Sequence, residues 1–235
     1  HIKSFNNRVL NCNDYFKESQ STEKLNAADY IFLTNIGIGS NTTIYLLFHI
    51  ETEQLYILKI FNNTYDLLDT NLCEREKENY LKVCHPYLLK YFGETKYEAK
   101  EGLILEYIEG STLDQIHHKL DKKYKIKIIF SIMIIIQYLH EKEFVYRDLK
   151  PNNIMIDQNG TIILIDLDRM ININKRQENA QESTVLFSTF SAPEVLNGKS
   201  ISYKTDIYSI GQIIFYLFND ELIENKANSC NVSSE

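Results

Sequence analysis

The chain has 235 residues, of which 44% are hydrophobic and 24% charged, and its formal net charge is −7. This length allows one large domain or one domain of two lobes, and the composition is ordinary for a soluble globular protein. The acidic balance argues against nonspecific binding to nucleic acid or to a membrane surface, because both require clustered positive charge.

Neither the cysteines nor the apolar runs indicate an exported or membrane protein. The four cysteines form no C-x-x-C pair, so they predict neither a zinc site nor a disulfide framework. Reduced cysteines are typical of the cytosol, and residues 1–13 lack the apolar core of a signal peptide. The most apolar run, Ile126–Tyr138, is shorter than the ~20 residues of a membrane span and indicates a buried helix. We therefore expect a cytoplasmic protein without a membrane segment.

The first half of the chain is rich in predicted strands. Residues 1–25 are polar with little periodicity, and we expect an extension there. β-Branched and aromatic runs separated by turns then predict three strands. These are Ile31–Leu33, Ile44–Ile50 and Gln54–Ile60, with a glycine turn at Gly37–Ser40. A helix is expected over Cys73–Val83, stopped by Pro86, and two more strands at Leu88–Phe92 and Gly102–Tyr107.

The second half of the chain is mainly helical. Apolar helices are expected over Ile126–His140 and Thr205–Phe218. Short strands at Ile154–Ile156 and Thr161–Ile165 flank a turn at Asn159–Gly160. A β-rich first half followed by an α-rich second half predicts an α+β fold of two lobes with a cleft between them.

The segment Tyr146–Asn153, which reads YRDLKPNN, carries the strongest chemical signal. It resembles the catalytic loop of protein kinases, H-R-D-L-x-x-x-N, with tyrosine in place of histidine. The resemblance implies that Asp148 orients the attacking hydroxyl and accepts its proton, and that Asn153 binds a metal ion. Lys150 would neutralise the γ-phosphate as charge moves. A polar turn explains Asp148 alone, but it does not explain the whole segment.

The segment Asp166-Leu167-Asp168 begins 18 residues after Asp148. It resembles the D-F-G segment of protein kinases, whose aspartate holds magnesium against the phosphates, so Asp166 is the implied Mg²⁺ ligand. Leu167 can fill the apolar position of the phenylalanine, whereas Asp168 replaces glycine. Glycine permits backbone conformations that aspartate tolerates less well, so we expect this segment to change conformation less readily.

The first lobe contains two segments that resemble nucleotide-binding motifs of the same family. Gly37–Ile44 resembles the glycine-rich loop G-x-G-x-x-G-x-V, with Thr42 where the third glycine is common. Gly37 and Gly39 would let backbone amides approach phosphate oxygens, although a hairpin turn alone explains them equally well. Fifteen residues after Ile44, Lys59 ends a strand that resembles V-A-I-K, whose lysine binds the α- and β-phosphates.

Lys59 requires a carboxylate partner on the helix that follows it. Counted back from His85-Pro86, Glu76 falls in the expected position. Glu74 and Glu78 point elsewhere by helical geometry, and a solvated charged face explains them. We expect an ion pair between Lys59 and Glu76.

The segment Ile104–Ile108 resembles the hinge between the kinase lobes. Leu105 would guard the back of the adenine pocket, and the backbone of Glu106 and Ile108 would bind adenine. Ile57 replaces an alanine that packs on adenine, and its larger side chain is expected to crowd the base. The resemblance divides the chain into an extension (1–25), a first lobe (26–106) and a second lobe (107–235). It assigns nucleotide contacts to Ile36, Gly37, Gly39, Ile44, Ile57, Lys59, Glu76, Leu105, Glu106, Ile108 and Met155.

Two later segments favour a protein kinase over a small-molecule kinase. Ser191–Glu194 resembles A-P-E, and Asp206–Gly211 resembles D-x-Y-S-x-G, whose aspartate braces the catalytic loop. Kinases of the aminoglycoside and choline type share the catalytic aspartate and asparagine but usually lack the loop lysine and both segments. Lys150 with Asn152 and Asn153 indicates the serine/threonine class.

The segment before Ser191 departs from the family pattern. It lacks G-T-x-x-Y, and Phe187 stands where a threonine would meet Asp148. Arg147 beside Asp148 is typical of control by phosphorylation, since arginine can pair with a phosphate. The candidate phosphate acceptors are Ser183, Thr184, Ser188 and Thr189. An ordinary loop without a regulatory role explains these residues equally well.

The chain continues for 17 residues after Phe218 (219–235), fewer than a kinase second lobe usually has. Glu194 usually pairs with an arginine from that later part, yet no arginine follows Arg176. Three explanations stay open: a shortened kinase, a longer chain, or a partner that completes the lobe.

The sequence thus predicts a serine/threonine kinase that uses ATP and Mg²⁺ on a protein substrate, with no nucleic-acid or membrane partner. The alternative is a pseudokinase that acts as a nucleotide-binding or scaffolding module. Ile57, Asp168 and the unusual segment before Ser191 motivate this alternative. A small-molecule kinase is the third hypothesis.

Overall fold

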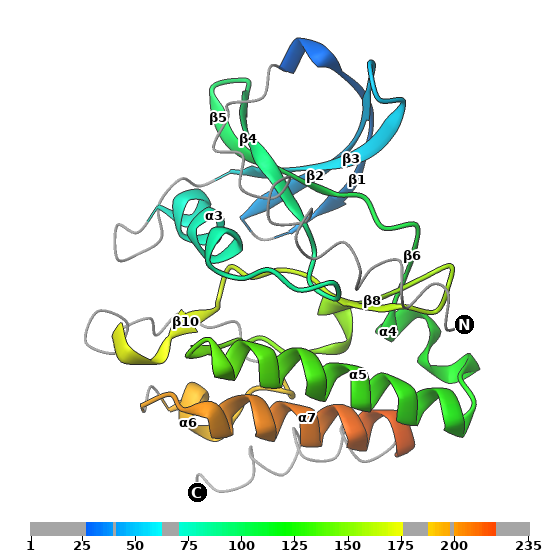
Figure 1. Cartoon of the computed structure of the whole chain (residues 1–235), viewed down its shortest axis with the longest axis vertical. Coiled ribbons are helices and arrows are strands. Elements are labelled where there is room, and N and C mark those ends of the chain that lie inside the picture. Colours follow the sequence, from blue (N-terminus) through cyan, green and yellow to red (C-terminus); the bar gives the residue numbers. More distant parts are fainter. Residues whose placement is uncertain (1–26, 40, 63–70, 176–187, 198–199, 220–235) are drawn as a thin grey trace, which may run out of the picture. The chain divides into compact units, whose positions relative to one another are not determined.

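The computed structural model describes residues 27–39, 41–62, 71–175, 188–197 and 200–219 (Figure 1). Contacts among these residues divide the chain into two compact units. Unit 1 contains the described residues up to Glu109 together with Asp166–Asp168. Unit 2 contains Gly110–Ile165 and the described residues from Arg169 onward. The predicted division between residues 106 and 107 therefore differs from these units, because residues 107–109 and 166–168 both belong to unit 1.

Unit 1 is built around a five-stranded antiparallel sheet that follows a short 3-10 helix, η1 (Ala27–Asp29). The strands are β1 (Tyr30–Ile38), β2 (Thr42–His49), β3 (Gln54–Phe61), β4 (Tyr91–Tyr97) and β5 (Lys100–Glu106), in the order β1-β2-β3-β5-β4. Helix α3 (Leu72–Lys82) follows β3 and contacts β4 and β5. The side chain of Asn71 caps α3 by accepting the backbone N–H of Glu74 at 3.0 Å.

The core of this sheet determines the direction of Lys59. One face of the sheet carries a buried apolar cluster with half-buried aromatic rings packed against it. The cluster consists of Leu47, Leu58, Ile60 and Ile104. Because successive residues of a strand face opposite sides, Lys59 and Ile57 on β3 face away from the cluster. Because Leu58 and Ile60 pack in the cluster, the side chain of Lys59 lies on the opposite face of the sheet.

Unit 2 is mainly helical, and its two long helices, α5 (Lys122–Glu141) and α7 (Tyr203–Phe218), lie side by side (Figure 1). A three-stranded sheet in the order β6-β8-β9 and a two-stranded sheet of β7 and β10 accompany them. The strands are β6 (Gly110–Thr112), β7 (Phe144–Val145), β8 (Ile154–Asp157), β9 (Ile162–Leu164) and β10 (Ile171–Asn172). The short helices are α4 (Leu113–Ile116), η2 (His117–Lys119), η3 (Pro151–Asn153), η4 (Ile173–Lys175) and α6 (Pro193–Leu196).

Helix α5 differs from its prediction in its start and in its burial. It begins at Lys122 rather than Ile126, because the side chain of Asp121 caps it by accepting a backbone N–H at 2.6 Å. The prediction that Ile126–Tyr138 forms a buried helix was wrong for one face, where Phe130 is 60% exposed. None of the helices in the described part of the chain has the length and apolar character that crossing a membrane requires.

Two other boundaries differ for local reasons. β4 starts at Tyr91 rather than Leu88, because the N–H of Leu88 closes a turn onto the carbonyl of His85 at 3.0 Å. α7 starts before the predicted Thr205, whose Oγ1 accepts the N–H of Ser202 at 3.3 Å. Side-chain and turn hydrogen bonds, which hydrophobic periodicity does not report, set both positions.

Candidate active site

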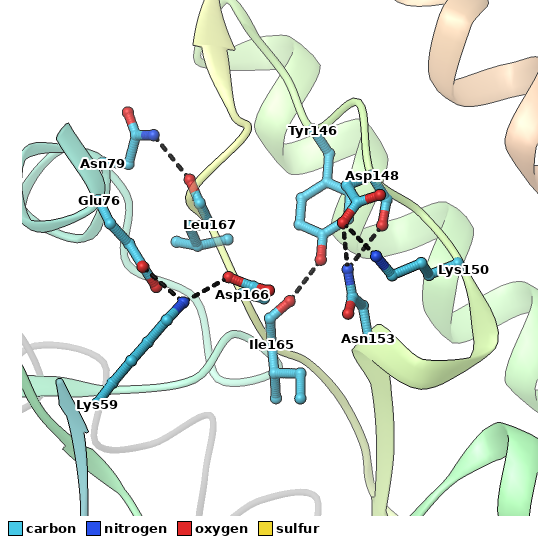
Figure 2. A network of polar contacts seen from close by, with 10 residues as sticks. All are labelled: Lys59, Glu76, Asn79, Tyr146, Asp148, Lys150, Asn153, Ile165, Asp166 and Leu167. Carbon is cyan, nitrogen blue, oxygen red and sulfur yellow. Dashed lines mark hydrogen bonds and ion pairs between the residues drawn. The ribbon is translucent and has the colours of Figure 1, made fainter. Parts of the chain in front are cut away.

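Unit 1 contains a buried lysine held by two carboxylates (Figure 2). Lys59 Nζ lies 2.6 Å from Glu76 Oε2 and 2.8 Å from Asp166 Oδ1. Lys59 is 8% exposed and Glu76 is fully buried, so the ion pair expected between them is present inside the unit. Glu74 and Glu78 instead form ion pairs with lysines of their own helix, both at 2.6 Å.

The electrostatics of this group follow from burial and mutual charge. Burial opposes the charge on Lys59, but Asp166 and Glu76 outweigh it and hold the pKa of Lys59 well above its usual range. Burial raises the pKa of the Glu76 carboxyl, and the ammonium of Lys59 opposes that shift. The lysine is therefore cationic, and its charge opposes the rise that burial causes in the pKa of the glutamate.

The segment around Asp166 is fixed by contacts with both its side chain and its backbone. Asp166 has φ = 66°, in the left-handed region that non-glycine residues rarely occupy. Its side chain is held by Lys59, and the carbonyl of Leu167 accepts a hydrogen bond from Asn79 Nδ2 at 2.7 Å (Figure 2). Leu167 is fully buried, as expected for an apolar residue in this position. These contacts explain why Asp166–Asp168 belongs to unit 1.

In unit 2, the carboxylate of Asp148 is held by two donors (Figure 2). Lys150 Nζ lies 2.7 Å from Asp148 Oδ2. Asn153 Nδ2 donates to the same oxygen and to the carbonyl of Asp148, both at 2.9 Å. The 3-10 helix η3 positions Asn153, because Pro151 favours its start and the N–H of Asn153 bonds the carbonyl of Lys150 at 3.0 Å. Local chain geometry thus brings the three predicted catalytic residues together.

A buried aspartate of α7 braces the backbone of the same loop. Asp206 is fully buried and accepts the N–H groups of Tyr146 and Arg147, each at 2.9 Å. His140 Nε2 lies 2.8 Å from the same carboxylate. Arg147 has φ = 71°, so the loop turns through a left-handed residue there. The hydroxyl of Tyr146 donates to the carbonyl of Ile165 (Figure 2).

The predicted glycine-rich segment, Gly37–Ile44, covers the end of β1 and the start of β2. The N–H of Gly39 donates to the carbonyl of Thr42 at 2.8 Å. A Cβ on Gly39 would lie 2.9 Å from Thr42 Oγ1, so a side chain there would displace the threonine. Gly37 pairs with Ile44 in register, and Ile36 is exposed beside it.

Three more of the predicted nucleotide contacts share one face of the sheet with Lys59. Ile44 pairs with Lys59, and Ile57 pairs with Leu105. Residues that pair directly across antiparallel strands point to the same side, so these side chains lie on the same face of the sheet as the lysine. Ile57 is half-buried there and Leu105 is buried.

The remaining predicted nucleotide contacts lie in two places. The N–H of Glu106 donates to the carbonyl of Lys90 at 2.9 Å, so this backbone group of the predicted hinge forms a hydrogen bond within unit 1. Ile108 is buried in unit 1. Met155 lies on β8 of unit 2, paired with Ile163, and is half-buried.

Of the four candidate phosphate acceptors, Ser183 and Thr184 lie outside the described residues, as does Phe187. Ser188 Oγ accepts the N–H of Phe190 at 3.2 Å, and Thr189 is exposed. No arginine follows Arg176 to pair with Glu194, and Glu194 Oε1 instead accepts a hydrogen bond from the hydroxyl of Thr205 at 2.8 Å.

Two residues of the site were missed by sequence reasoning. Asn79 was not considered, although it stands three residues after Glu76 and therefore on the same face of α3. His140 was assigned only to an apolar helix, although a histidine near its end can reach a neighbouring element. A polar residue among apolar positions of a helix face was the available signal in both cases.

Comparison with known proteins identifies the family. A family model described as "Protein kinase domain" matches residues 30–234. The serine/threonine-protein kinase AtPK1/AtPK6 of Arabidopsis thaliana is 28% identical over 80% of this chain and 41% of its own length. The SNF1-like protein kinase ssp2 of Schizosaccharomyces pombe is 28% identical over 90% of this chain and 39% of its own. Ribosomal protein S6 kinase 2 alpha of Xenopus laevis is 26% identical, over 86% and 28% respectively.

The chain therefore spans less than half of the length of each of these curated relatives. The match of the family model nevertheless covers most of the chain, and the α+β architecture agrees with it. This chain belongs to the protein kinase family.

Proposed function

We propose that this chain is a catalytically active serine/threonine kinase domain that transfers the γ-phosphate of ATP to a hydroxyl of a protein substrate. The observation that carries the proposal is the set of contacts around Asp148. A catalytic base must be held within reach of the proton that it accepts, and Lys150 and Asn153 fix this carboxylate at 2.7 and 2.9 Å. The names of the serine/threonine kinases that this chain resembles support the choice of substrate hydroxyl.

In this proposal Lys59 binds the α- and β-phosphates of ATP. Its ammonium is cationic, buried and oriented by Glu76 at 2.6 Å. A fixed cation in a site of low dielectric stabilises phosphate charge more strongly than a mobile surface lysine does. The half-buried side chains of Ile44 and Ile57 on the same face would form an apolar wall for the adenine.

The oxygen atoms of Asp166 and Asn153 suit Mg²⁺, which prefers oxygen ligands. The Asp166 side chain is 33% exposed, which leaves part of its carboxylate accessible. Asn153 uses Nδ2 for its two hydrogen bonds to Asp148, so its Oδ1 can serve as a ligand. Bound Mg²⁺ would neutralise charge on the phosphates.

During transfer, Asp148 would accept the proton of the substrate hydroxyl as its oxygen attacks the γ-phosphorus, while the bond from that phosphorus to the bridging β-phosphate oxygen breaks and ADP leaves. Lys150, already beside this carboxylate, would neutralise the charge that develops on the transferred group. Asp206 would keep the loop in place by holding the backbone of Tyr146 and Arg147.

We also place the protein in the cytoplasm, since its cysteines are scattered, and Cys73 and Cys84 are free thiols.

The second candidate is a pseudokinase that binds nucleotide or scaffolds a partner. Ile57 favours it, because this branched side chain lies on the face of Lys59 where a small residue would leave room for adenine. Asp168 also favours it, because it adds a negative charge near Lys59.

Phosphate transfer from radiolabelled Mg-ATP distinguishes the candidates. The wild type and Asp148→Asn are each incubated with a generic basic protein, and the label is assigned to residue type. We expect label on serine or threonine that Asp148→Asn loses by about 10²–10⁴-fold. Both proteins should gain thermal stability with Mg-ATP, since the base does not hold the nucleotide. Nucleotide binding without transfer in the wild type would favour the pseudokinase.

A further inference from the structure

Asn79 connects α3 directly to the backbone of the segment that carries the proposed metal ligand. Asn79 lies one turn after Glu76, and the residue is 5% exposed. Its side-chain amide donates a hydrogen bond to the carbonyl of Leu167 at 2.7 Å (Figure 2). All of these residues belong to unit 1. The contact is therefore an internal, desolvated hydrogen bond between a helix and a peptide group beside Asp166.

Helix α3 thus holds this segment by two separate routes. The first runs from Glu76 through Lys59 to Asp166, at 2.6 and 2.8 Å. It depends on an ammonium that two carboxylates share and that phosphate would also attract in the proposed function. The second route, from Asn79 to Leu167, uses a neutral amide and does not involve the lysine. A hydrogen bond between two neutral groups depends less on the charges around Lys59 than the ion pairs of the first route do.

The backbone of this segment requires such support. Asp166 has φ = 66°, and a non-glycine residue holds a left-handed conformation only where its surroundings compensate for the strain. A change of conformation here would leave the buried carbonyl of Leu167 without its hydrogen-bond donor. The cost of an unsatisfied buried carbonyl exceeds the net value of the hydrogen bond itself.

We propose that Asn79 is a positioning residue that fixes the backbone at Asp166 in its metal-binding conformation, independently of Lys59. It couples α3 to Asp166–Asp168, so that displacement of the helix releases the segment and displacement of the segment loosens the helix. The proposal rests on the proposed function in one respect, because it takes Asp166 as the Mg²⁺ ligand.

The first test is hydrogen exchange of the nucleotide-free chain, followed by mass spectrometry of peptides that cover residues 165–170 and 72–82. Asn79→Ala and Asn79→Leu both remove the hydrogen-bond donor. Alanine is smaller than asparagine, whereas leucine is similar to it in size. Asn79→Gln keeps an amide donor. Glu78→Ala is the matched control, since Glu78 pairs with Lys82 on the exposed side of the same helix at 2.6 Å. We expect exchange of both peptides to rise about tenfold in the first two variants, to recover in part in Asn79→Gln, and to stay unchanged in the control.

The second test is the magnesium dependence of the thermal shift that ATP produces. The half-saturating Mg²⁺ concentration should rise about tenfold in Asn79→Ala and stay at the wild-type value in Glu78→Ala. If the wild type shows no shift with Mg-ATP, the proposed function fails, and the exchange experiment alone decides whether Asn79 holds the segment. Wild-type exchange at residues 165–170 in the Ala and Leu variants would overturn the proposal. So would a uniform rise across the strands of unit 1, which would show that Asn79 only supports the fold.

Discussion

Lys59 and Glu76 form an ion pair in which neither partner has appreciable contact with solvent: Nζ and Oε2 are 2.6 Å apart, and the side chains are 9% and 0% exposed. A buried pair of this kind is sensitive to the loss of one member, because the charge that remains has neither water nor a partner. The size of that effect depends on pH, since a buried carboxyl can take up a proton instead of remaining charged.

Replacing Lys59 by methionine should destabilise unit 1 more at high pH than at low pH. The pKa of Glu76 is already raised by burial, and removal of the ammonium takes away the main influence that lowers it. Above the pKa of the unfolded state the unfolded chain gives up the proton that the folded variant retains, so stability falls as pH rises. We expect the stability of Lys59→Met to fall more between pH 5.5 and pH 8 than the stability of the wild type does.

Urea unfolding at the two pH values measures this difference. Lys77→Met is the matched control, because Lys77 also contacts two carboxylates, Glu74 at 2.6 Å and Glu94 at 3.0 Å, but Glu74 is 50% exposed. The control should show little dependence on pH. An equal loss for Lys59→Met at both pH values would contradict the role given to the lysine.

Asp166→Asn should weaken the magnesium dependence of nucleotide binding and leave the fold largely intact. The amide keeps an oxygen for Lys59 at the present 2.8 Å contact, but it lacks the negative charge that a divalent cation prefers. We expect the half-saturating Mg²⁺ concentration for ATP binding to rise by about 10-fold or more. Calorimetry at fixed ATP and varied Mg²⁺ checks this expectation, and an unchanged curve would remove Asp166 from the metal site.

Much of this site could be predicted because the chemistry depends on residues that are close in sequence. Asp148, Lys150 and Asn153 lie within one loop, and a 3-10 helix brings them together without help from distant segments. The direction of Lys59 also followed from strand alternation. The ion pair with Glu76 was predictable because neighbouring candidate glutamates are two residues apart on the helix and therefore point to nearly opposite sides, so Glu76 faces the sheet when Glu74 and Glu78 do not.

The parts that could not be predicted depend on hydrogen bonds between segments far apart in sequence. Asn79 and Leu167 are 88 residues apart, and no periodicity links a helix amide to that carbonyl. The same holds for His140 and Asp206, which are 66 residues apart. A tyrosine in place of the loop histidine gave no indication that its hydroxyl would reach the carbonyl of Ile165. Side-chain contacts to distant backbone are specific to each chain, so a sequence pattern alone does not report them.

Asp206→Asn should destabilise the catalytic loop. The carboxylate accepts the N–H groups of Tyr146 and Arg147 on different oxygens and also contacts His140. An asparagine has one acceptor oxygen, so its NH₂ group would face at least one of these donors without a bond. We expect a loss of ~2–4 kcal/mol in the free energy of unfolding and a parallel loss of phosphate transfer.

Thermal and urea unfolding measure the loss for Asp206→Asn. Asp157→Asn is its matched control, since Asp157 Oδ1 accepts the N–H groups of Asn159 and Thr161 at 2.9 and 2.7 Å in a more exposed turn. It should cost about 1 kcal/mol. Equal effects of the two substitutions would indicate that Asp206 does not have the special role of a buried brace.

His85 should make the folded chain less stable as pH falls below neutrality. Burial lowers the pKa of its ring from 6.5 to about 4, and its Nδ1 accepts the N–H of Tyr87 at 3.2 Å, which requires the neutral form. A group whose folded pKa is depressed contributes stability that is complete above the unfolded pKa and is lost as pH falls toward the folded pKa. Because the ring is only partly buried, we expect a loss on the order of 1 kcal/mol between pH 7 and pH 5.

Urea unfolding of wild type and His85→Gln at pH 7, 6 and 5 tests this expectation. Glutamine can still accept the N–H of Tyr87 through its side-chain oxygen but does not titrate, so its stability should change less over this range. His118→Gln, at an exposed histidine of unit 2, is the matched control and should follow the wild type. If His85→Gln loses as much stability as wild type between pH 7 and pH 5, other groups are responsible for the acid sensitivity. If it retains more, the partly buried ring at the start of the turn before β4 is the titrating group, and its effect is separate from that of the Lys59–Glu76 pair, which acts at higher pH.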